Sequence, residues 1–118
     1  MITVFIRRPE RLYQIFEYIN RNETGWHITL VCCRDESNGD PKKVYHEIES
    51  TLPILQKAGV FPHFKIDLIY KDKQFGPDII AEVSKQFQIH PNRIFIGSIH
   101  YSHEFDYHEL FGARIIFN

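Results

Sequence analysis

Two adjacent arginines, Arg7 and Arg8, are the side chains of this sequence best suited to hold an anion. They come directly after an apolar run that ends at Ile6. A guanidinium group binds a phosphate or a carboxylate through two parallel hydrogen bonds, so both arginines are candidate ligand-binding residues. The alternative is that they are solvated or form weak surface ion pairs. Three acids are suitable partners for such pairs: Asp35, Glu36 and Asp72.

A second candidate segment follows another apolar run and contains Gly97, Ser98 and His100. A glycine at this position lets a phosphate approach backbone N–H groups without a side chain in the way. The Ser98 hydroxyl can add a contact to the same anion, or it can begin a turn and cap local backbone groups. Cys33 ends a third apolar run and completes the set of residues expected to line a ligand crevice.

Three histidines, His100, His103 and His108, belong to the densest cluster of ionisable groups in the sequence. Three carboxylates accompany them: Glu104, Asp106 and Glu109. Such groups can ligate zinc or another divalent ion when they converge on one point. The spacing His-x2-His-x4-His matches no closed zinc site, and a loop can scatter the rings. We therefore expect a titratable surface loop here and no metal centre.

The two cysteines, Cys32 and Cys33, are adjacent in an apolar run that reads as a strand. Neighbouring side chains on a strand point to opposite faces, so the two thiols are not expected to bridge each other. A reduced pair in the cytoplasm is the expected state, and buried thiols are usually inert. Ser98 lacks the Gly-x-Ser-x-Gly context of a nucleophile elbow. No residue therefore predicts nucleophilic catalysis, and we expect a protein that is not an enzyme.

Length and charge narrow the possible functions further. The 118 residues are enough for one domain, predicted to span 1–118, and the hydrophobic fraction of 43% is typical of globular proteins. The net charge of −1 argues against binding to nucleic acid or to anionic membranes. No apolar run approaches the roughly 20 residues of a membrane span, and no signal peptide opens the chain. We expect a cytoplasmic domain without membrane insertion.

Apolar runs alternate with amphipathic segments along the whole chain. Strands are expected at 2–7, 27–33, 64–71, 93–97 and 113–117. Helices are expected to begin at Pro9, at Pro41 after an Asp40 N-cap, and near Pro77. The first helix shows the apolar spacing i, i+3, i+4, i+7, at Leu12, Ile15, Phe16 and Ile19. Between 98 and 112 we expect at most one short helix, near 106–111.

This alternation predicts an α/β fold with a doubly wound, mostly parallel five-stranded sheet. The segment 64–71 alternates apolar and polar residues, as an edge strand does, whereas 2–7 and 93–97 are nearly all apolar. The strand order 3-2-1-4-5 follows. Its winding reverses between the first and fourth strands, so a ligand crevice is expected outside their carboxyl ends. Arg7 and Gly97 should then lie side by side at that rim.

The chain resembles the universal stress protein family along nearly its whole length. The resemblance is carried by the opening strand, by LQKAGV at 55–60, by GPDIIAEV at 76–83 and by RIFIGS at 93–98. The segment RIFIGS resembles the strand of that family that leads into a phosphate-binding loop. The resemblance implies ATP or AMP as the ligand. ATP-binding members carry an acid after the first strand and two further glycines in the loop. Here arginines replace the acid, and His100 and Leu110 replace the glycines.

The resemblance, with these departures, implies a non-enzymatic regulatory or ligand-sensing module of the stress-response type that does not bind ATP in the usual way. Two alternatives stay open: an ATP- or AMP-binding member with a degenerate loop, and a cytoplasmic domain attached to a membrane transporter. In the family the final strand pairs with its copy across a two-fold axis. The strand from Ala113 to Phe117 is apolar and suits such a homodimer, unless the preceding loop covers it.

Overall fold

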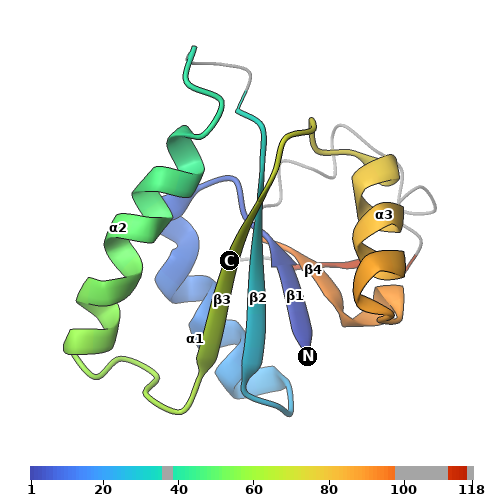
Figure 1. Ribbon diagram of the computed structural model, residues 1–118. Helices are drawn as coiled ribbons and strands as arrows, with labels where there is room; N and C mark the ends of the chain where they lie inside the picture. Colours follow the sequence, from blue (N-terminus) through green and yellow to red (C-terminus); the bar gives the residue numbers. More distant parts are fainter. Residues whose placement is uncertain (36–38, 98–111, 117–118) are drawn as a thin grey trace.

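A computed structural model describes residues 1–35, 39–97 and 112–116 of the chain (Figure 1). Its α-helices are α1 (Leu12–Asn22), α2 (Lys43–Lys57) and α3 (Pro77–Phe87). Two short 3-10 helices, η1 (Pro9–Arg11) and η2 (Pro91–Arg93), precede α1 and the fourth strand. The strands are β1 (Ile2–Phe5), β2 (His27–Cys33), β3 (Lys65–Lys71), β4 (Ile94–Ile96) and β5 (Arg114–Ile115).

The strands form a parallel sheet in which β3, β2, β1 and β4 lie in that order. This part of the predicted strand order is confirmed. The segment β5 pairs in parallel with β4 through two residues only, where a strand from Ala113 to Phe117 was expected. Phe117 lies outside the described residues. β3 lies at the edge of the sheet and none of its side chains is fully buried, which explains its alternating sequence.

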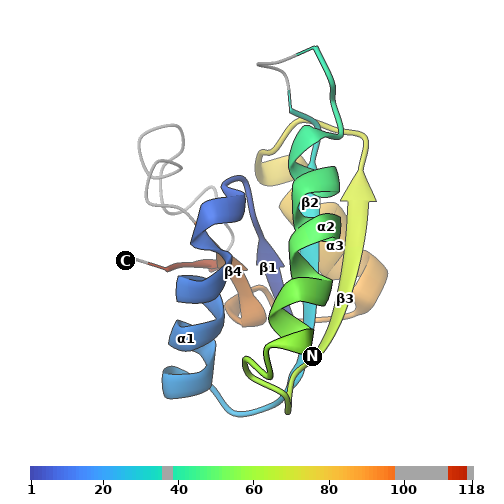
Figure 2. The same cartoon turned by 90° about the vertical axis from the view of Figure 1, so that its left-hand side faces the viewer.

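Helices cover both faces of the sheet, with α1 and α2 on one side and α3 on the other (Figures 1 and 2). Because side chains alternate along a strand, β1 contributes to two separate cores. Ile2 and Val4 lie in the core beneath α1 and α2, whereas Phe5 lies in the core beneath α3. Burial on both faces is the reason why β1, β2 and β4 are nearly continuous apolar runs.

The first helix buries the four apolar residues that its spacing predicted: Leu12, Ile15, Phe16 and Ile19. The prediction for the second helix is wrong at its start. Pro41 is not its first residue, because α2 begins at Lys43. The Asp40 carboxylate instead accepts a hydrogen bond from the Lys42 N–H at 3.0 Å, and the Asp40 carbonyl accepts one from the Lys43 N–H at 3.2 Å. Asp40 thus closes a turn before the helix.

The first strand is also shorter than predicted, since it ends at Phe5 rather than at Arg7. The Ile6 N–H still donates to the Val31 carbonyl at 3.0 Å, and Ile6 is buried. Arg7 is exposed beyond that last bond. A charged side chain cannot enter the core that covers both faces of β1, so the strand gives way to a turn at the first arginine.

Candidate anion-binding site

The carboxyl ends of the parallel strands share one edge of the sheet, at the top of Figure 2. Phe5 lies beside Val31 of β2 and beside Ile96 of β4. The segments that follow β1, β2 and β4 therefore leave the sheet next to one another. The Gly97 N–H donates to the Phe5 carbonyl at 2.9 Å. Gly97 therefore lies beside Phe5, which precedes Arg7 by two residues.

Gly97 is buried, and a side chain at this position would meet helix α1. A Cβ built on Gly97 would lie 2.6 Å from Cδ1 of Ile15 and 3.3 Å from the Phe5 carbonyl oxygen. Atoms do not approach so closely without movement of one partner. The direction in which a side chain would leave Gly97 is thus occupied by Ile15, and the Gly97 N–H is already donated to Phe5. This packing accounts for the glycine by itself, and the ligand-binding role of Gly97 stays a prediction.

Both predicted arginines are exposed at the carboxyl edge. The Arg8 Nε lies 3.8 Å from Glu10 Oε1, and 44% of the Arg8 side chain is accessible, so this ion pair is a weak one. Arg7 lies close enough to Cys33 for its positive charge to lower the pKa of that thiol, against the stronger effect of burial. The structure thus brings Arg7 and Cys33 together, as expected for residues at one rim.

The two cysteines are free and belong to different faces of β2. Cys32 lies in the core beneath α1 and α2, and Cys33 packs against the core beneath α3. They cannot bridge each other or bind one ion together, as the strand geometry predicted. Burial raises the pKa of Cys32 to about 12, helped by the neighbouring Cys33, and burial raises the pKa of Cys33 to about 12 as well. Both are protonated at neutral pH.

Further cations follow β2 and β3 at the same edge, and sequence reasoning missed them as site residues. Arg34 comes directly after β2, Lys71 ends β3, and Lys73 lies two residues beyond. We call Arg7, Arg8, Arg34, Lys71 and Lys73 the basic rim. The sequence signal that could have found them is their position, because each of the first three expected strands ends at a basic residue or is followed directly by one.

An acid at the rim, Asp72, pairs with Arg34 and not with Arg7 or Arg8. The Arg34 Nε donates to Asp72 Oδ1 at 2.9 Å, and the Tyr70 hydroxyl donates to the same oxygen at 3.0 Å. These bonds, that from Arg34 first, hold the pKa of Asp72 below its usual value. Burial and the acceptor Asp72 raise the pKa of Tyr70. Lys42 Nζ lies 5.1 Å from the centre of the Tyr70 ring and adds a second cation nearby.

The other two rim cations are joined to helix α3. Lys73 Nζ donates to the Glu82 carboxylate, and Lys71 Nζ lies 3.5 Å from the same group. The hydrogen bond from Lys73 is the main reason why the pKa of Glu82 is lowered. The segments 7–8, 34–35 and 71–73 hold five cations and two carboxylates, and Glu82 of α3 adds a third carboxylate. The carboxyl edge of β1, β2 and β3 is therefore positive in a chain of net charge −1.

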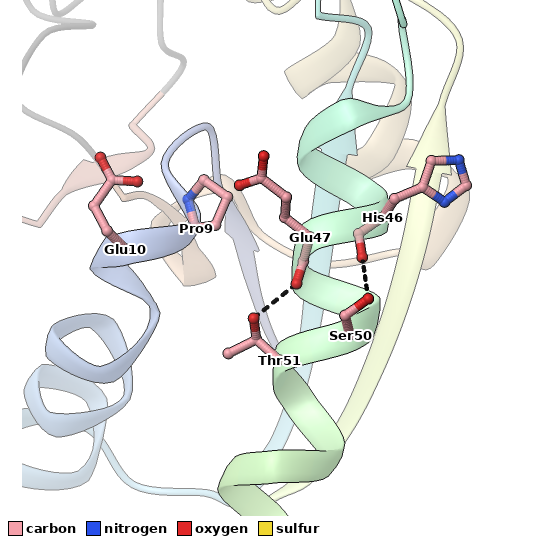
Figure 3. A pocket seen from close by; sticks show the side chains of 6 residues that line it. All are labelled: Pro9, Glu10, His46, Glu47, Ser50 and Thr51. Atoms are coloured by element: carbon pink, nitrogen blue, oxygen red, sulfur yellow. Dashed lines mark hydrogen bonds between the residues drawn. The ribbon is translucent and has the colours of Figure 1, made fainter.

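A shallow groove of about 560 Å³ lies between η1 and α2, near this edge (Figure 3). Its polar side chains are mostly acidic or already bonded. Glu10 and Glu47 flank Pro9, whereas His46 points away from them. The hydroxyls of Ser50 and Thr51 donate to carbonyls of their own helix at 3.0 and 2.7 Å. Two carboxylates repel anions, so this groove is not part of the anion site.

Several predicted residues lie outside the described part of the chain: Ser98, His100, His103 and His108. Within the residues that are described, no three His, Cys, Asp or Glu side chains are grouped to hold a metal. Over the same residues, no helix has both the length and the apolar character that crossing a bilayer requires. Comparisons with models of protein families, with curated proteins and with solved structures found no match.

Proposed function

We propose that this chain is a non-enzymatic ligand-sensing domain of the universal stress protein type, which binds a multiply charged anion at the basic rim. One observation carries the proposal: each of the strands β1, β2 and β3 has a cation at its last residue or within two residues after it, all at one edge of the sheet. In open parallel sheets, ligands bind outside the carboxyl ends of the strands. A local excess of positive charge attracts an anion there and raises its rate of association.

The binding of ATP or AMP in the usual way is the rival function. It is disfavoured by the packing of Ile15 against Gly97 and by the use of the Gly97 N–H within the sheet. A phosphate cradle needs bare backbone N–H groups that point at the ligand. The cations of the basic rim offer side-chain donors instead, and a guanidinium fork needs no glycine to reach a phosphate oxygen.

The module would act as a cytoplasmic homodimer or as a domain attached to a membrane transporter. The dimer is proposed to form through the strand from Ala113 to Phe117, within which β5 (Arg114–Ile115) pairs with β4 on one side. A strand at the end of a sheet offers its unpaired backbone groups to a second copy. Light scattering during gel filtration measures the mass, and a purely monomeric protein would count against this dimer.

Calorimetric titration with sodium tripolyphosphate at low ionic strength tests the anion site. We expect saturable binding that weakens as salt is added, because exposed charges are screened. The double variant Arg7→Gln/Arg8→Gln should lose about tenfold or more in affinity, as expected from the loss of charge-assisted hydrogen bonds.

The matched control is Lys65→Gln, which removes one cation from the opposite end of β3. This variant should bind tripolyphosphate as the parent chain does, and circular dichroism should show the same fold for all variants. Absence of binding in the parent chain, or equal losses in the control and the arginine variant, would overturn the proposed site.

A further inference from the structure

We infer that the basic rim recognises the charge of its anion alone, and that a nucleoside attached to that anion adds nothing to the affinity. This inference rests on the proposed function. It concerns the class of ligand: an inorganic or simply substituted polyanion in place of a nucleotide. The geometry that points to it is the packed floor of the crevice between β1 and β4, together with the spread of the rim cations over β1, β2 and β3.

The crevice floor between β1 and β4 is closed by packed residues. Phe5, Ile6, Ile96 and Gly97 are all buried at this end of the two strands. Ile15 of α1 covers the Cα of Gly97, and the Gly97 N–H is bonded to the Phe5 carbonyl. A nucleoside needs an open apolar slot for its base and a few free polar groups that orient it. The described residues at this floor offer neither.

The charge of the rim extends from that crevice toward the edge strand β3. Arg7 and Arg8 follow β1, Arg34 follows β2, and Lys71 and Lys73 lie at the end of β3, whereas the residue that follows β4 is Gly97. An anion drawn to the centre of this charge would sit over β1 and β2. The described side chains there, Arg7, Arg8 and Arg34, are exposed and charged, and they form no apolar slot for a base.

Asp72, an acid among the cations of the rim, allows a second and independent test of the inference. Asp72 holds Arg34 at 2.8 Å and is itself exposed at the same edge. If charge alone decides the affinity, then Asp72→Asn removes a repelling group and strengthens binding of a polyanion. The control is Asp67→Asn, which removes the same charge from the middle of β3, where Asp67 pairs with His27 at 2.6 Å.

The test compares ATP with methyl triphosphate, which has the same triphosphate ester and charge but carries a methyl group in place of the nucleoside. Calorimetry at one ionic strength should give affinities that differ by less than about threefold. Adenosine should neither bind nor compete. Asp72→Asn should bind both triphosphates several times more tightly than Asp67→Asn does.

The possible failures are distinguishable. If ATP binds more than about tenfold more tightly than methyl triphosphate, or if adenosine competes, the nucleoside is recognised and the inference is wrong, although an anion site remains. If Asp72→Asn binds no better than its control, charge at the rim does not set the affinity, and the inference is again wrong. If neither triphosphate binds, the proposed function fails and the inference fails with it.

Discussion

At the scale of the residue, Gly97 shows how one sequence feature can have two physical causes. A glycine after a buried strand is required wherever a ligand approaches the backbone, and equally wherever another element packs too closely for a Cβ. Here the atom that occupies the space is Ile15 Cδ1, 2.6 Å from the position of the missing Cβ. The glycine is thus explained by the contact between α1 and the sheet.

This explanation predicts the effect of Gly97→Ala. The added methyl group should push α1 from the sheet and destabilise the protein by about 1–3 kcal/mol, the usual effect of overpacking a core. Ile15→Val removes the very atom that the new methyl group would meet. In the Ile15→Val background, Gly97→Ala should therefore cost much less. Urea unfolding of the four proteins measures the coupling, and strictly additive effects would contradict the assigned contact.

At the scale of the element, most helices and strands follow from local pattern, but their ends depend on single residues. The strand His27–Cys33 has the predicted bounds, and α1 buries the predicted face. The predicted start of α2 is wrong, because the Asp40 side chain accepts a hydrogen bond from the backbone of a turn and does not cap the helix. Both conformations satisfy the same donors, so the sequence alone does not choose between them.

The end of α3 gives a prediction at this scale. Gln88 follows the helix with φ 53°, in the left-handed region that favours glycine. Gln88→Gly should therefore stabilise the protein by about 1 kcal/mol, since a side chain with a Cβ is strained there. The control Lys85→Gly, inside the last turn of α3, should destabilise it by about 1 kcal/mol. Thermal unfolding of both variants decides the sign. A loss of stability in Gln88→Gly would refute the strain.

At the scale of the whole molecule, charge is distributed unevenly although it nearly cancels. Cations collect where the first three strands end, and two acids of this region, Asp72 and Glu82, accept hydrogen bonds from Arg34 and Lys73. These bonds join β2 to the end of β3, and β3 to α3, so they link the carboxyl ends of the strands to the helix layer. They also determine how the stability of the fold should depend on pH.

The folded-state pKa values of Asp72 and Glu82 lie below their ordinary values of 3.8 and 4.5. A lowered pKa stabilises the fold above the unfolded-state pKa, and this contribution is lost as pH falls through the folded-state pKa. The double variant Asp72→Asn/Glu82→Gln should thus be less stable than the parent at pH 7 and should approach it below about pH 4. Urea midpoints at pH 7 and pH 3 measure the difference. A gap that is unchanged at pH 3 would mean that the carboxylate charges do not stabilise the fold.

The sequence by itself determined the alternation of strands and helices, the strand order β3-β2-β1-β4 and the exposure of Arg7 and Arg8 at the carboxyl edge. These features depend on apolar periodicity and on short-range steric effects, and both are determined by residues that are close together in the sequence. Only the tertiary structure decided that Ile15 fills the space above Gly97 and that Arg34, rather than Arg7, holds Asp72. Those contacts join residues far apart in the chain, and only the packing of layers brings them together.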